Sequence, residues 1–141
     1  MDKTAFLARV EAYHKAGWRL ALINATTVMP AAGEGTAEGA GEGAFELAWG
    51  FARDGRAGQS TGPSLELIRE TVKTGDEVPS ISAFFGAAFL YENELRELFG
   101  INVTGIGVDL KGQLYKTATR VPFSHRAVRA RLEAAEGKAN S

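Results

Sequence analysis

The sequence predicts a single α+β domain, in which an antiparallel sheet of about four strands packs against helices and an extended C-terminal tail follows. Three observations predict this class. The chain has 141 residues, a usual length for one domain, and shows no internal repeat. Its hydrophobic content of 45% suffices for a buried core. Its β-rich runs and its helical patterns are segregated along the chain, which is typical of α+β proteins.

The first elements follow from local patterns. Thr4 can cap a helix whose apolar residues, among them Phe6 and Val10, recur at helical spacing, and Gly17 can end it. Residues 18–29 are then rich in β-branched and aliphatic side chains, and Pro30 follows them. We therefore expect a helix followed by a strand.

Two further runs are interpreted as strands. Residues 44–52 alternate large apolar and other side chains, so they should pair back on the first strand. Residues 64–74 alternate again, which favours a strand, although a short helix is possible. Residues 31–43 contain only Gly, Ala, Glu and Thr, and we expect this Gly/Glu-rich segment to be a flexible loop.

The second half of the chain predicts one long helix and a tail. The helix should run from a capping Ser82 to Phe99, with Gly100 as its stop. We place the domain boundary there, so that the α+β domain spans residues 1–101 and the tail with a basic C-terminal helix spans residues 102–141. Extended, glycine-containing tails rarely pack alone, so we expect it to leave the domain and to be ordered mainly by a partner.

Composition excludes several classes of protein. The absence of cysteine rules out disulfides, Cys-ligated Fe–S clusters and thiolate-bound metals within this chain. The two histidines lie far apart in sequence, and the net charge of −1 argues against a nucleic-acid binder. No apolar run is long enough to span a bilayer. We expect a cytoplasmic protein without direct membrane insertion.

The charges are unevenly distributed. Residues 31–50 contain four glutamates and no basic residue, whereas residues from Lys111 onward are mostly basic among the charged ones. Such asymmetry can steer a partner towards the chain. Two solvated surfaces would explain it equally well.

The most informative stretch is residues 78–101, with the sequence Val-Pro-Ser-Ile-Ser-Ala-Phe-Phe-Gly-Ala-Ala-Phe-Leu-Tyr-Glu-Asn-Glu-Leu-Arg-Glu-Leu-Phe-Gly-Ile. The first half of its helix is nearly all apolar and should lie in the core. The second half carries charges, and Glu92 and Arg96 have the favourable order and spacing for an ion pair on a helix.

At these residues the sequence resembles the family of the 30-kilodalton subunit of respiratory complex I. It resembles most the branch of that family found in energy-converting, membrane-bound [NiFe] hydrogenases. Residues 78–80 match the Val-Pro-Ser that precedes the family's helix. Glu92, Glu94 and Glu97 match its acidic positions, and residues 98–101 match its Phe-Gly-Ile end.

Two substitutions depart from the complex I pattern, and the first, which gives Glu-Asn-Glu at residues 92–94, is more similar to the hydrogenase branch. Asn93 replaces the family's arginine, and Arg96 replaces the usual aromatic residue or histidine. In addition, a His-Pro-Asp-Leu-Arg-Arg segment is missing, and residues 105–115 stand in its place. Their Asp-Leu-Lys-Gly run is more similar to the hydrogenase proteins.

The resemblance implies a non-catalytic docking subunit without a cofactor. It would pack against the large catalytic subunit and the Fe–S small subunit, which would carry the [NiFe] centre and the Fe–S clusters. The complex would be peripheral to the inner face of the cell membrane and would couple electron transfer to ion translocation. A subunit of an NADH:quinone oxidoreductase (complex I) is one alternative.

A stand-alone acid/base enzyme using Glu92 and Glu94 is the other alternative, but residues two apart on a helix point about 200° apart. We therefore expect no catalytic, cofactor-binding or metal-binding residue. Because a charge buried at an interface must be paired, we expect partner arginines or backbone donors for Glu92 or Glu94. The predicted partner-interface residues are Glu92, Glu94, Arg96, Glu97, Phe99, Gly100, Ile101, Lys111, Tyr115 and Arg120.

Overall fold

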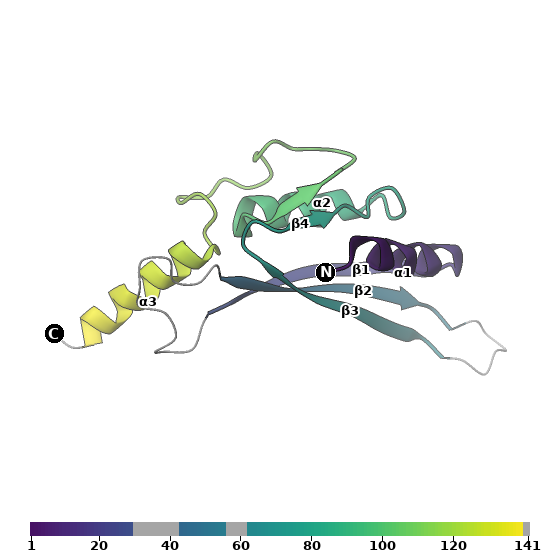
Figure 1. Ribbon diagram of the computed structural model, residues 1–141, viewed down its shortest axis with the longest axis horizontal. Helices are drawn as coiled ribbons and strands as arrows, with labels where there is room; N and C mark the ends of the chain where they lie inside the picture. Colours follow the sequence, from purple (N-terminus) through teal and green to yellow (C-terminus); the bar gives the residue numbers. More distant parts are fainter. Residues whose placement is uncertain (30–42, 56–61, 140–141) are drawn as a thin grey trace.

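The computed structural model describes residues 1–29, 43–55 and 62–139, and its core is a three-stranded antiparallel sheet. The strands β1 (Arg19–Val28), β2 (Ala44–Arg53) and β3 (Ser64–Lys73) lie in the order β1-β2-β3. The helices α1 (Lys3–Lys15) and α2 (Ala88–Glu94) cover one face of this sheet (Figure 1). The α+β class and the three predicted strands are therefore confirmed.

Alternate residues of the central strand form the middle of the core. Ile23 of β1 and Ile68 of β3 lie opposite Trp49 of β2, and all three side chains are buried. The ring of Phe6, from α1, lies 4.6 Å from the Trp49 ring, so α1 closes the core from above. The alternation that predicted β2 thus reflects burial of one face of the strand; the residues that point inward from it are Phe45, Leu47, Trp49 and Phe51.

The two ends of α1 differ in how well the sequence predicted them. Asp2, not Thr4, is the N-terminal cap, because its Oδ1 accepts the N–H groups of Thr4 at 3.0 Å and Ala5 at 3.1 Å. A carboxylate also interacts favourably with the positive end of the helix dipole. Gly17 ends the helix as predicted, with a φ of 76°.

The long predicted helix is shorter and of two kinds. It begins at Ala88 rather than at Ser82, and α2 continues into a π-helix, η1 (Leu95–Phe99). Ser82 is not its cap, because the helix begins six residues later, and the Ser82 hydroxyl instead accepts the N–H of Gly107 at 2.9 Å. Gly100, with a φ of 76°, ends η1 as expected.

A separate two-stranded parallel ladder replaces the fourth strand that we expected. β4 (Glu77–Pro79) pairs with β5 (Asn102–Thr104), and the helices α2 and η1 form the crossover between them. The chain leaves the sheet after β3 at Gly75, whose φ of 92° turns it towards the helical layer. The predicted domain boundary, between residues 101 and 102, therefore falls immediately before a strand that belongs to the folded unit.

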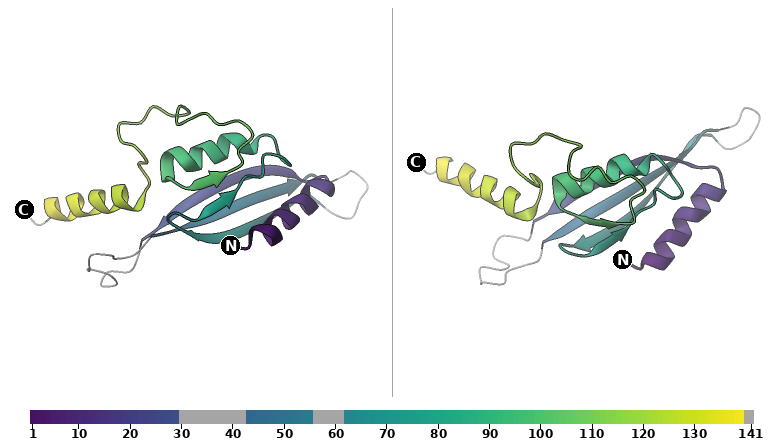
Figure 2. Two further views of the ribbon diagram at one scale, coloured as in Figure 1. Left: turned by 45° about the horizontal axis from the view of Figure 1, so that its top comes forward. Right: turned by 90° about the horizontal axis from the view of Figure 1, so that it is seen from above.

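The extended C-terminal tail is confirmed, since residues 105–124 contain neither helix nor strand. Its first part does not leave the domain, however, but lies along α2 and η1 (Figure 1). The tail ends in the basic helix α3 (His125–Ala139), which buries none of its side chains and projects from the domain (Figure 2).

No helix in the described ranges is long and apolar enough to cross a membrane. The predicted loop 31–43 lies outside the described residues, apart from Gly43.

His125 joins the tail to the end of the sheet. Its Nε2 lies 2.8 Å from the carbonyl oxygen of Ala44 and 3.1 Å from that of Val28. Its ring occupies the space beside Gly43, where an added Cβ would lie 1.9 Å from the His125 Cδ2. A glycine is thus required at position 43 by the close approach of this ring.

Replacing Gly43 with Ala should therefore displace His125 and loosen the start of α3. We expect a loss of about 1–3 kcal/mol in the free energy of unfolding, as for other overpacked sites. Urea unfolding measures this loss, and NMR of the His125 ring reports its displacement. Gly86→Ala is the control, because nothing lies within 4 Å of its added Cβ. Equal stability of the two variants would contradict the role of this contact.

Candidate interaction site

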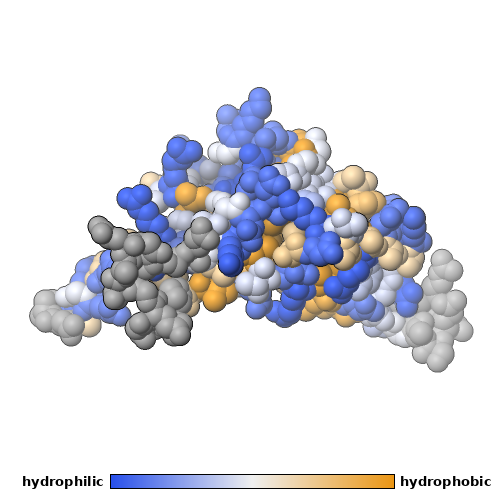
Figure 3. Space-filling model, viewed as in Figure 1, coloured by the Kyte–Doolittle hydropathy of each residue, from blue (hydrophilic) through white to orange (hydrophobic). Residues whose placement is uncertain are grey.

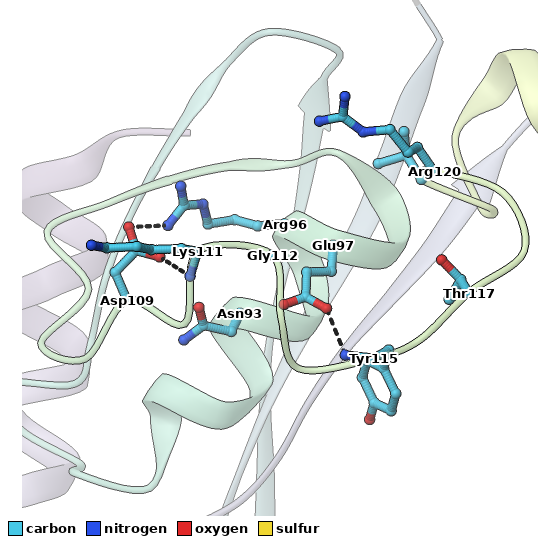
Figure 4. Close-up of a pocket in the computed structure, with 10 residues that line it drawn as sticks. Asn93, Arg96, Glu97, Asp109, Lys111, Gly112, Tyr115, Thr117 and Arg120 are labelled. Carbon is cyan, nitrogen blue, oxygen red and sulfur yellow. Dashed lines mark hydrogen bonds and ion pairs between the residues drawn. The ribbon is translucent and has the colours of Figure 1, made fainter.

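A cavity of about 520 Å³ lies where the C-terminal tail crosses the end of the second helix (Figure 4). The helical residues come from α2 and η1, and the rest come from the tail between residues 109 and 121. The lining residues are Asn93, Arg96, Glu97, Asp109, Lys111, Gly112, Tyr115, Thr117, Arg120 and Val121.

Asn93 attaches the first part of the tail to the helix. Its side chain is 1% exposed. Its Nδ2 donates to the carbonyl oxygens of Phe89 at 2.7 Å and Val108 at 2.8 Å, and its Oδ1 accepts the N–H of Leu110 at 2.9 Å. A buried amide with all these partners holds the tail in one position, because breaking any of the bonds would leave a buried polar group unsatisfied.

Glu97 attaches the next part of the tail. Its two carboxylate oxygens accept the backbone N–H groups of Leu114 at 2.6 Å and Tyr115 at 2.8 Å. Asn93 and Glu97 are four residues apart and therefore project from the same side of the helix. Hydrogen bonds to a carboxylate are stronger than those between neutral groups, so Glu97 is a strong anchor.

Two further contacts link exposed side chains across the cavity rim. Arg96 forms an ion pair with Asp109 at 3.0 Å, and the backbone N–H of Lys111 donates to the same carboxylate at 2.8 Å. The Lys111 N–H and the Arg96 guanidinium together lower the pKa of Asp109. Glu94 accepts the hydroxyl proton of Tyr115 at 2.7 Å, and this bond raises the pKa of the tyrosine.

Glu92 bonds to a different segment from the other two glutamates. One carboxylate oxygen accepts the Ser80 hydroxyl at 2.6 Å, and the other accepts the N–H of Ile81 at 2.7 Å. The side chain is 2% exposed. Burial raises the pKa of Glu92 because it disfavours the charged form, and the two hydrogen bonds offset part of that effect. The backbone donor that we expected for Glu92 comes from the chain itself.

The structure brings half of the predicted interface residues to one place. Arg96, Glu97, Lys111, Tyr115 and Arg120 all line the cavity. The other five do not line it. Of these, Ile101 is 4% exposed and lies in the core.

Phe99 also has partners within the chain. Its ring packs against the rings of Phe45 and Phe123, at 6.2 and 5.2 Å between centroids. Phe99 and Ile101 therefore stabilise the end of η1 against the sheet and the tail. Their proposed contact with another subunit stays a prediction.

Sequence reasoning missed the cavity residues whose importance depends on the tail's path. Asn93 was noted only as a departure from a family pattern, although an asparagine within a helix is itself a signal of a side-chain-to-backbone bond. Asp109, Gly112, Thr117 and Val121 gave no such signal. Within the described residues, no group of His, Asp and Glu side chains could hold a metal ion.

The sequence of the chain matches a known protein family. The model of the family described as "Respiratory-chain NADH dehydrogenase, 30 Kd subunit" matches residues 20–124, which is more than half of the chain. The match runs from the first strand of the sheet to the end of the tail, and so includes the whole cavity. No curated protein matches the chain.

Replacing Glu92 with Gln should reduce the pH dependence of stability. A raised pKa means that the folded state holds the proton more tightly than the unfolded chain does. The resulting stabilisation is complete below the ordinary glutamate pKa of about 4.3 and is lost as the pH rises through the raised pKa. Urea unfolding between pH 4 and 8 should show Glu92→Gln gaining relative to the wild type as the pH rises. A difference that does not change with pH would refute this assignment.

Replacing Glu97 with Ala should release the tail from the helix while leaving the sheet intact. The backbone N–H groups of Leu114 and Tyr115 lose their acceptors, so their amide hydrogens should exchange at least tenfold faster. Glu133→Ala on the exposed helix α3 is the matched control. The idea fails if the two amides exchange at the same rate in both variants.

Proposed function

The chain belongs to the family of the respiratory-chain NADH dehydrogenase 30 Kd subunit, and we propose that it is a non-catalytic docking subunit in the [NiFe]-hydrogenase branch of that family. Membership makes it a subunit of a respiratory-chain-type oxidoreductase complex, which assembles with other subunits. The hydrogenase assignment and the docking role are the parts that we add.

One observation favours the docking role over the alternative, a small acid/base enzyme. Glu92, Glu94 and Glu97 each accept hydrogen bonds from donors within the chain. A general base must reach a substrate proton, whereas these carboxylates hold the chain's own segments together. Glu92 and Glu94, the pair required by the enzyme alternative, bond to different segments, near residues 80 and 115. The three glutamates of the motif at residues 78–101 thus hold together the segments around the helix.

A second observation favours the hydrogenase branch over complex I. Two sequence features suggested that branch: Asn93 in place of an arginine, and the Asp-Leu-Lys-Gly run at residues 109–112. The Asn93 amide bonds to the backbone of Val108, immediately before that run, and of Leu110, within it. The two features that resemble the hydrogenase branch therefore lie together in one structural unit. Complex I remains the second candidate, because the family's description names an NADH dehydrogenase subunit.

In the proposed complex this chain contacts the hydrogenase-type large catalytic subunit and the Fe–S small subunit. Those partners would carry the [NiFe] centre and the Fe–S clusters, and this chain would carry no cofactor. The chain would be held at the inner face of the cell membrane through its complex and would not insert into the bilayer.

Affinity purification of the tagged chain from its native cells, in mild detergent, tests this proposal. We expect the large and Fe–S subunits to co-purify in stoichiometric amounts, together with nickel and hydrogen evolution from reduced methyl viologen. NADH oxidation without nickel would identify complex I instead. Recovery of the chain without any redox subunit would overturn the docking role.

A further inference from the structure

We infer that the cavity between η1 and the tail receives an acidic segment of a partner polypeptide, whose carboxylates pair with Lys111 and Arg120. This inference rests on the proposed docking function. It goes further by naming the part of the surface that is used and the chemistry of what it binds.

The charges around the cavity support an anionic occupant. Arg96 is paired with Asp109, and both oxygens of Glu97 are occupied by backbone N–H groups. The Lys111 ammonium and the Arg120 guanidinium are exposed, and neither has an ion pair or side-chain hydrogen bond with any residue that the structure describes. Lys111 and Arg120 thus both line the cavity without an ion pair or a side-chain hydrogen bond within the described residues, although the Lys111 charge also acts on the nearby Asp109 carboxylate.

The backbone around the cavity gives independent support. Lys111 has a φ of 54° and Val121 a φ of 45°, and within the described ranges no other non-glycine residue has a positive φ. Left-handed backbone is unfavourable for side-chain-bearing residues, and especially for a β-branched valine. Unfavourable conformations of this kind concentrate at functional sites, and here both occur in the wall of one cavity.

The arrangement of the cations favours a polypeptide over a small anion. In Figure 4, Arg96 and Glu97 lie between Lys111 and Arg120, so an extended ligand suits the two cations better than a single phosphate does. The Glu97 and Asp109 carboxylates in the wall would also repel a doubly charged phosphate. Two separate Asp or Glu side chains on one segment, one for each cation, suit this arrangement and place less negative charge beside Glu97 and Asp109 than a doubly charged phosphate does.

The surroundings of the cavity are also suited to an acidic segment. Figure 3 shows many hydrophilic side chains along the upper edge of the molecule, where the tail runs, with some hydrophobic ones among them. Beyond the cavity the chain continues into α3, on which Arg126 and Arg129 are further basic residues. Positive charge extended in this way steers an acidic partner during association and selects against basic ones.

Zero-length crosslinking of the purified complex tests the inference directly. A water-soluble carbodiimide joins a lysine amine to a carboxylate only where the two are in contact, and mass spectrometry identifies the joined peptides. We expect Lys111 to be joined to an Asp or Glu of a co-purifying subunit. The pair Lys3 and Glu77, 2.6 Å apart within this chain, is the positive control. Lys111→Arg should retain the partners and lose the crosslink.

Charge reversal gives a second, independent readout. The double variant Lys111→Glu with Arg120→Glu should recover at least tenfold less of the partner subunits than the wild type. The charge-conserving control, Lys111→Arg with Arg120→Lys, should recover them normally, and circular dichroism checks that both variants fold.

The outcomes separate this inference from the proposed function. If the wild-type chain recovers no redox subunit, the docking function itself fails. If the wild type and the charge-reversed variant recover the partners equally, the docking function stands and the acidic-segment inference is wrong. The absence of any intermolecular crosslink at Lys111 in an intact complex would also overturn it.

Discussion

The path of the C-terminal tail depends on hydrogen bonds from two side chains, those of Asn93 and Glu97. Residues 105–124 form no helix or strand, so their backbone groups have no regular partners within the segment. Polar backbone groups that leave water must find partners elsewhere. The Asn93 amide and the Glu97 carboxylate provide partners for the N–H groups of Leu110, Leu114 and Tyr115. These two anchors hold the part of the tail that forms one wall of the cavity.

Glu92 has the corresponding role on the other side of the same helix. It binds the Ser80 hydroxyl and the Ile81 N–H, in the segment that joins β4 to α2. The helical unit formed by α2 and η1 therefore holds the chain that precedes it and the chain that follows it. In this unit the polar side chains of α2 and η1 point towards the two neighbouring segments and bond to them. Glu92, Glu94 and Glu97, the three glutamates of the residue 78–101 motif, all bond to these neighbouring segments.

This use of the glutamates connects the fold to the function. The docking role that we propose needs a surface whose shape persists, and here carboxylates bonded within the chain hold the surface around the cavity in place. In our inference, Lys111 and Arg120 are the side chains of this surface that bind a partner. Electrostatic contacts of this kind contribute more to the choice of partner and to the rate of association than to affinity itself.

The sequence by itself determined the features that depend on local patterns. A run rich in β-branched and aliphatic residues predicted β1, and alternating side chains predicted β2 and β3, because such patterns suit strands with one face against the core. Gly17 and Gly100 predicted the two helix ends, since both positions adopt a left-handed backbone that glycine allows. The charged end of the residue 78–101 motif also indicated the family correctly.

Only the tertiary structure decided which groups bond to one another over long separations. The sequence predicted that Ser82 caps a helix. In the structure its hydroxyl instead accepts the N–H of Gly107, which is 25 residues away. Glu97 bonds to backbone 17 and 18 residues further along the chain. Periodicity reports which side of an element is buried, but a hydrogen-bond partner depends on where separate segments meet. That meeting place is set by the whole core, and so it has no local signal in the sequence.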